Sequence, residues 1–271
     1  MVLARRSPPQ SSRTSETHSR ADPASAVTLR ISMHTMKSIY INGDSYSAPD
    51  QSLTVYSQHL AQLTGRTVIN RARSGMGNRN IIRTTLQDLH QAEPCVCVVA
   101  LSFIHREELW CADAVWQRNP QLNARMRSTE RQQGSRFITD SWLSDADTNS
   151  LPLGHRRYMD ICRQWSDAYV DLYMLAHSLT QLGHDYYIFG AAHNTIGAPE
   201  LDFQYRGYLF NLPQYQWCQQ NPRIRMLEQF DIPTWARDRG ITTSSTGHLD
   251  TEGHLLFAQW LQAEMVAQGL L

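Results

Sequence analysis

Segments with the pattern of buried strands alternate with helical segments from residue 37 to the end of the chain, and this alternation restricts the fold most. The strand-like segments read SIYIN, TVIN, CVCVVAL and DYYIFGAA. Amphipathic helical patterns cover residues 52–65, 78–91, 155–183 and 251–268. A continuous apolar run such as CVCVVAL is typical of a strand buried on both faces. Strands alternating with helices predict an α/β fold, in which a parallel sheet carries helices on both sides.

The length of 271 residues fits one α/β domain of ordinary size. Residues 1–35 are rich in Ser, Thr, Arg and Pro and contain almost no aromatic residue, so we expect a disordered tail. The domain is then expected to span residues 36–271. Two stretches without clear periodicity, at about 111–152 and 199–234, are expected to be insertions.

The charge balance disfavours nucleic acid or an anionic membrane as the main partner, since 25 basic residues face 25 acidic ones. No apolar run approaches the roughly 18 residues of a membrane span. The five cysteines have irregular spacing, and two of them lie in an apolar run. We therefore expect reduced, buried thiols, a cytoplasmic location, and neither a metal nor another cofactor. A metal site built from His105, His193, His248 and His254 is disfavoured because the spacing matches no known metal motif.

The first strand ends in a sharp turn, INGDSYS, which places Asp44 and Ser45 at the carboxyl edge of the sheet. Ligands of parallel α/β sheets bind at this edge. One interpretation is an ordinary turn whose Asp or Ser caps the next helix. The other is that Ser45 is a nucleophile held at the end of a strand.

The second loop, RARSGMGN, brings Gly75, Gly77 and Asn78 to the start of a helix at the same edge. Glycines before a helix expose backbone N–H groups, which are the donors that an oxyanion hole requires. Ordinary turns contain such glycines as well. The loop becomes informative only together with a nucleophile.

A third segment, TGHLDTEGHLLFAQWL, places His248 just before the last helix. A histidine there could act as a general base over the sheet edge, although a surface or capping histidine has the same sequence pattern. Asp250 is an equally good N-cap residue for that helix.

These three segments together resemble the SGNH (GDSL-type) hydrolases over nearly the whole chain from Met36, and most closely compact bacterial and phage proteins of that kind. The resemblance implies a three-layer α/β/α sandwich with a flavodoxin-like parallel sheet. It also implies that Ser45 is the nucleophile and that His248 is its base. The backbone N–H groups of Ser45 and Gly75 would line the oxyanion hole.

Two positions depart from the family pattern. Ile104 stands near the position of the family's oxyanion-hole asparagine, and Ser245 stands where the family has the aspartate of the triad. Asn78, His105 or Arg106 could replace the missing donor, and Asp250 the missing acid. Asp44 and His193 follow strands at the same edge and complete the candidate binding residues.

We therefore predict a serine hydrolase that cleaves a small acyl ester or a carbohydrate O-acetyl group. Its partner would be a small-molecule or glycan ester. The alternatives are an SGNH-fold binding or phage structural protein with impaired catalysis, and an O-acyltransferase on the same scaffold. The oligomeric state is not predicted.

Overall fold

Four parallel strands form the centre of the protein in the computed structural model, in the order β2-β1-β3-β6. They are β1 (Ile39–Gly43), β2 (Val68–Asn70), β3 (Val96–Leu101) and β6 (Asp185–Gly190). This order is the one found in flavodoxin-like sheets. The structure describes residues 36–50, 52–104, 106, 108–110, 137–139, 161–194, 203–245 and 247–271.

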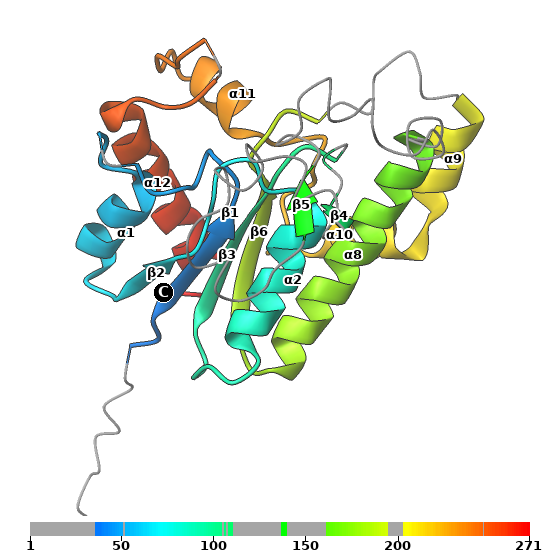
Figure 1. The fold of residues 1–271 in the computed structure, drawn as a ribbon, viewed down its shortest axis with the longest axis horizontal. Helices are drawn as coiled ribbons and strands as arrows, with labels where there is room; N and C mark the ends of the chain where they lie inside the picture. Colours follow the sequence, from blue (N-terminus) through cyan, green and yellow to red (C-terminus); the bar gives the residue numbers. More distant parts are fainter. Residues whose placement is uncertain are drawn as a thin grey trace, which may run out of the picture. The chain divides into compact units, whose positions relative to one another are not determined.

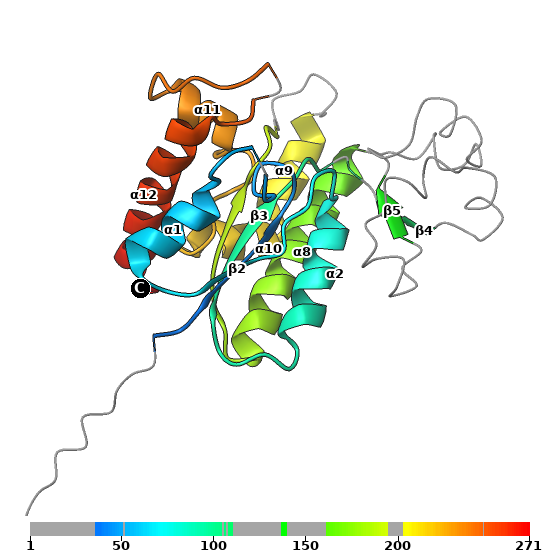
Figure 2. The ribbon, with the colours of Figure 1, turned by 60° about the vertical axis from the view of Figure 1, so that its left-hand side comes forward.

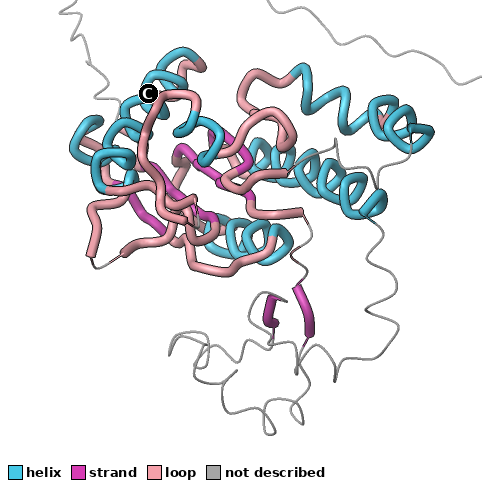
Figure 3. The backbone as a smooth tube through the Cα atoms, turned by 90° about the horizontal axis from the view of Figure 1, so that it is seen from above, coloured by secondary structure: helices cyan, strands magenta, loops and turns pink. Residues whose placement is uncertain are grey.

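Helices cover both faces of this sheet, which confirms the expected three-layer α/β fold (Figures 1 and 2). On one face lie α1 (Tyr56–Thr64), α11 (Ile232–Arg237) and α12 (Thr251–Ala267). On the other lie α2 (Asn78–Leu89), α8 (Ile161–Gln181), α9 (Phe203–Asn211) and α10 (Pro213–Gln220). Seen from above, the sheet lies between these two groups of helices (Figure 3).

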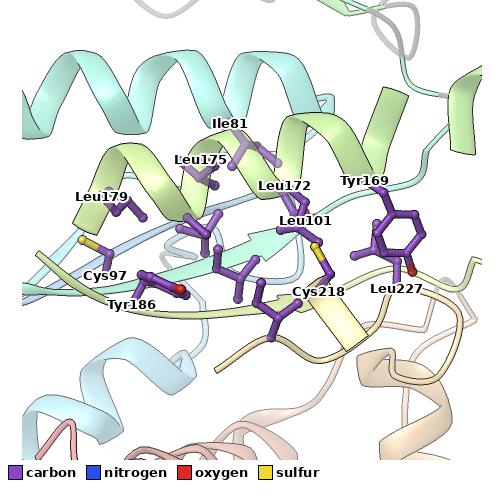
Figure 4. Close-up of a cluster of buried hydrophobic side chains, with 14 of the residues drawn as sticks. Ile81, Cys97, Leu101, Tyr169, Leu172, Leu175, Leu179, Tyr186, Cys218 and Leu227 are labelled. Carbon is purple, nitrogen blue, oxygen red and sulfur yellow. The ribbon is translucent and has the colours of Figure 1, made fainter. Parts of the chain in front are cut away.

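The strand β3 shows how the sequence builds two hydrophobic cores at once. Side chains of a strand alternate between its faces. Val96, Val98 and Ala100 accordingly pack in the core beneath α1 and α12. Cys97, Val99 and Leu101 pack in the core beneath α2 and α8 (Figure 4). Burying each such aliphatic side chain contributes roughly 1.5–3 kcal/mol, which explains the continuous apolar run.

The expectation of an irregular segment over residues 199–234 is wrong for much of its length. Residues 203–211 form α9, residues 213–220 form α10, and α11 begins at Ile232. Within the expected insertion at 111–152, the structure describes only β5 (Phe137–Thr139), which pairs antiparallel with β4 (Glu108–Trp110). The expected tail over residues 1–35 lies outside the described residues. None of the described helices combines the length and the apolarity that a membrane span needs.

Candidate active site at the carboxyl edge of the sheet

Ser45 lies at the top of a tight turn that follows β1. The carbonyl of Asp44 accepts hydrogen bonds from the N–H groups of Ser47 at 3.1 Å and Ala48 at 2.9 Å. Oδ1 of the Asp44 side chain accepts a further hydrogen bond from the N–H of Tyr46 at 3.1 Å. Among the described residues, neither the N–H nor the hydroxyl of Ser45 takes part in a hydrogen bond. The half-buried Ser45 is therefore held in place by its neighbours while its own polar groups stay available.

Asp44 is completely buried and holds an arginine at the edge of the sheet. Its Oδ2 accepts a hydrogen bond from the Ser102 hydroxyl at 2.7 Å and lies 3.3 Å from Nη1 of Arg106. Arg106 also donates to the Ser102 hydroxyl at 2.8 Å. Burial raises the pKa of Asp44, and Ser102, Tyr46, Arg106 and His248 offset part of that rise. Asp44 thus orients Arg106, whose side chain stays 17% exposed.

Asn78 ties the start of α2 to the loop after β3. Its Oδ1 accepts a hydrogen bond from the N–H of Ser102 at 2.7 Å, and its Nδ2 donates to the Ser102 carbonyl at 3.3 Å. Gly75, in the preceding loop, has a φ of 81°, which L side chains rarely adopt. The structure therefore gives Asn78 a positioning role, since both ends of its amide bind backbone.

Ile104, which is expected near the position of the asparagine in the SGNH pattern, is held by a second amide side chain. Its N–H donates to Oδ1 of Asn194 at 3.0 Å. The Nδ2 of Asn194 donates to the carbonyls of Ser102 at 3.3 Å and Ala192 at 3.0 Å. Asn194 is not among the residues predicted from the sequence, although it follows the fourth strand at the predicted edge. His105 lies outside the described residues.

His248 lies beside the Ser45 turn. Its ring stacks on Tyr46 with centroids 4.5 Å apart and an angle of 12° between the ring planes. A short hairpin holds it, because its N–H donates to Oγ of Ser244 at 3.1 Å and its carbonyl accepts from the N–H of Ser244 at 2.8 Å. In the part of the chain that the structure describes, no hydrogen bond joins Ser45 to His248. Catalytic hydrogen bonds often form only once substrate is bound.

Asp250 caps the last helix. Its Oδ1 accepts a hydrogen bond from the N–H of Gly253 at 2.7 Å, and its N-cap position begins α12. Within the described residues no hydrogen bond connects Asp250 with His248. The capping role, which the sequence left open beside the role of a triad acid, is the one that these contacts support.

His193 pairs with an aspartate that the sequence analysis did not select. Its Nδ1 lies 2.8 Å from Oδ2 of Asp231, and the Asp231 side chain is only 8% exposed. Asp231 also caps α11 by accepting a hydrogen bond from the N–H of Thr234 at 2.6 Å. The His193 ring is 57% exposed. It borders a cavity of about 540 Å³, which is further lined by Pro233, Thr234, Arg237, Gly240, Ile241, Thr242 and Thr243.

Gly77 is needed because the β3 loop passes directly over it. A Cβ at this position would lie 2.4 Å from the carbonyl oxygen of Arg106, a backbone atom. We expect Gly77→Ala to lower the free energy of unfolding by about 1–3 kcal/mol, because the loop must shift. The matched control is Gly207→Ala in α9, where a Cβ meets nothing within 4 Å. This variant should gain up to about 1 kcal/mol in urea unfolding. Equal stability of the two variants would contradict the prediction.

Comparisons with known proteins place the chain beside several esterases of known structure. It is similar to a protein assigned to the lipolytic G-D-S-L family from Desulfitobacterium hafniense, with 10% identity and a TM-score of 0.43 over 84% of this chain and 99% of the other. It is also similar to the psychrotrophic esterase EstA of Pseudoalteromonas, with 12% identity and a TM-score of 0.47 over 86% and 98% of the two chains. A third is an acetylxylan esterase of Geobacillus stearothermophilus, with 11% identity and a TM-score of 0.45 over 85% and 95%.

Searches with protein-family models and among curated proteins found no match. The similar structures include a protein of the G-D-S-L type that the sequence resembles. These structures give no support to the expected similarity to phage proteins.

Proposed function

We propose that the protein is a serine hydrolase that cleaves a small acyl ester or a carbohydrate O-acetyl group through an acyl-enzyme at Ser45. The hydroxyl of Ser45 attacks the ester carbonyl while His248 takes its proton. His248 then returns that proton to the leaving alcohol. Water, activated by the same imidazole, releases the acid and restores the serine.

The stacking of His248 on Tyr46 carries this proposal. Tyr46 directly follows Ser45, so the stack brings an imidazole from the end of the chain to the turn that presents the serine. A serine hydroxyl is a weak nucleophile without an adjacent base. The unused N–H and hydroxyl of Ser45 within the described residues fit a group that binds and attacks a substrate.

The oxyanion hole of this proposal differs from the family pattern. The N–H groups of Ser45 and Gly75 supply two donors, and Ile104 supplies none from its side chain. Loss of one such donor lowers turnover by roughly a hundredfold to a thousandfold. We assign the replacement donor to the guanidinium of Arg106, which hydrogen bonds to Asp44 and Ser102 hold in a fixed position. The amide of Asn78 is already bound to backbone.

The substrate side of the proposal is the cavity beside His193. Its lining combines a histidine, an arginine and three threonines, all able to bind the hydroxyl groups of a carbohydrate alcohol. The buried carboxylate of Asp231 orients the ring of His193. His193 would therefore bind the alcohol part of the ester. We further propose a cytoplasmic location, which the free buried thiols of Cys95, Cys97 and Cys218 favour.

The second candidate function is binding without catalysis. It is favoured by the two amides at the β3 loop, since Asn78 and Asn194 are both bound to backbone, and the side chain of Ile104 offers no donor. Such a protein would bind a glycan ester and leave it intact.

A fluorophosphonate probe separates the two functions, because it reacts only with an activated serine. We expect peptide mass spectrometry to find the label on Ser45 in the wild type. Labelling should fall by at least about a hundredfold in His248→Ala, which removes the base. The control is His177→Ala on α8, far from the candidate site in sequence and fold. An unlabelled Ser45 in folded wild-type protein, or equal labelling in His248→Ala, would refute the hydrolase.

A further inference from the structure

Two thiols and an imidazole meet at the opposite end of the sheet from Ser45, where β3 and β6 begin. Cys95 and Cys97 are two residues apart and therefore face the same side of the strand. His184 immediately precedes β6, whose first residue, Asp185, pairs with Val96 between the two cysteines. The three residues are only 3%, 0% and 4% exposed. Figure 4 shows Cys97 beside Leu179 and Tyr186 in the core.

The ligand atoms of this cluster already stand at the spacing of a metal site. The two sulfur atoms are 3.7 Å apart, and Sγ of Cys95 lies 3.4 Å from Nδ1 of His184. One ligand atom from each residue lies within 4.8 Å of the others. Metal–thiolate bonds of about 2.3 Å hold two sulfurs roughly 3.8 Å apart at a tetrahedral angle and about 4.0 Å apart at the 120° angle of a three-coordinate site.

The hydrogen bonds of His184 direct the correct nitrogen toward the thiols. Its Nε2 lies 3.1 Å from the carbonyl of Leu89, which can only accept, so Nε2 carries the proton. Nδ1 then presents its lone pair, and it accepts a hydrogen bond from the N–H of Cys95 at 3.2 Å. Histidines that bind metals usually donate their other N–H to a carbonyl or carboxylate in this way. A bound ion would replace the Cys95 N–H as the partner of Nδ1.

We propose that Cys95, Cys97 and His184 form a buried three-coordinate site for the soft monovalent ion Cu(I). Soft thiolate ligands select Cu(I) or zinc, and structural zinc sites are almost always four-coordinate. Among the described residues no further Cys, His, Asp or Glu joins this cluster, and both cysteines pack in the hydrophobic core. The net charge of such a site is only −1, because Cu(I) neutralises one of the two thiolates and the imidazole is neutral. This ion lies outside the proposed ester chemistry, which needs no metal.

The test is a competition between the reduced full-length protein and a coloured Cu(I) chelator under anaerobic conditions. We expect the wild type to retain one Cu(I) per chain, with a sulfur-to-copper band in the ultraviolet. Cys97→Ser and Cys95→Ser should each lower the affinity by about a hundredfold or more, since each removes a thiolate. The matched control is Cys218→Ser, which removes another completely buried thiol of the same core. Circular dichroism checks that each variant is folded.

Because the site is closed, the same competition is repeated after refolding in the presence of Cu(I). The proposal would be overturned if the wild type retained Cu(I) neither as the reduced protein nor after refolding with Cu(I). Equal affinity of wild type and both folded cysteine variants would do the same. Retention of Zn²⁺ in place of Cu(I) would overturn the three-coordinate assignment. Labelling of Ser45 by the fluorophosphonate is read separately, so the two proposals fail independently.

Discussion

Ser45→Ala is expected to abolish hydrolysis of p-nitrophenyl acetate, with a fall in kcat/KM of at least about 10⁴-fold, while the fold is retained. Removal of the nucleophile leaves only binding and the oxyanion donors, which supply a small part of the total acceleration. The Ser45 hydroxyl makes no hydrogen bond among the described residues, so its loss should change the free energy of unfolding by no more than about 0.5 kcal/mol. Initial rates and urea unfolding measure the two effects.

The control is Ser52→Ala, an exposed serine seven positions further on whose hydroxyl donates a hydrogen bond to Asp50. Its activity should match that of the wild type within twofold or so, because an exposed serine that caps a surface turn has no part in the proposed chemistry. Wild-type turnover in Ser45→Ala would show that another group performs the chemistry. A large loss of stability in that variant would show instead that Ser45 is a structural residue.

The central sheet was predictable because its strands carry a local signal. One uninterrupted apolar run contains Val96, Cys97 and Val98. A strand that is buried on both faces consists almost entirely of apolar residues. The helices α9 and α10 gave no such signal. They are 9 and 8 residues long, and their polar and apolar residues are mixed around the helix axis. Their stability comes from packing against α8, which no local pattern reveals.

The candidate site was predictable only in part, for the same reason. The turn with Ser45 and the loop with His248 can each be recognised in a few consecutive residues. The stack of His248 on Tyr46 and the pair of His193 with Asp231 join residues that are far apart in the sequence. For Asp231 one local signal was present, since an Asp before Ile-Pro is a typical N-cap. That signal identifies a helix start, not the partner of a histidine.

Acid is expected to destabilise the protein through His254, which is buried at the start of α12. Burial, together with the nearby His59 and His248, lowers its pKa from 6.5 to about 4. Its Nδ1 has no hydrogen-bond partner among the described residues. Between these two pKa values the unfolded chain binds a proton that the folded protein does not. The free energy of unfolding should therefore fall by about 3 kcal/mol as the pH drops from 6.5 to 4.

Urea unfolding of wild type and His254→Gln at pH 7, 6, 5 and 4 measures this contribution as the difference between the two pH profiles. Glutamine cannot take up the proton. Between pH 7 and pH 4 the free energy of unfolding of the variant should therefore fall by about 3 kcal/mol less than that of the wild type, whatever the stability of the variant at pH 7. His90→Gln, at the exposed end of α2, should keep the full wild-type slope. Parallel profiles for wild type and His254→Gln would mean that His254 is protonated as readily in the folded protein as in the unfolded chain. The start of α12 would then admit water to that ring, contrary to its 5% exposure.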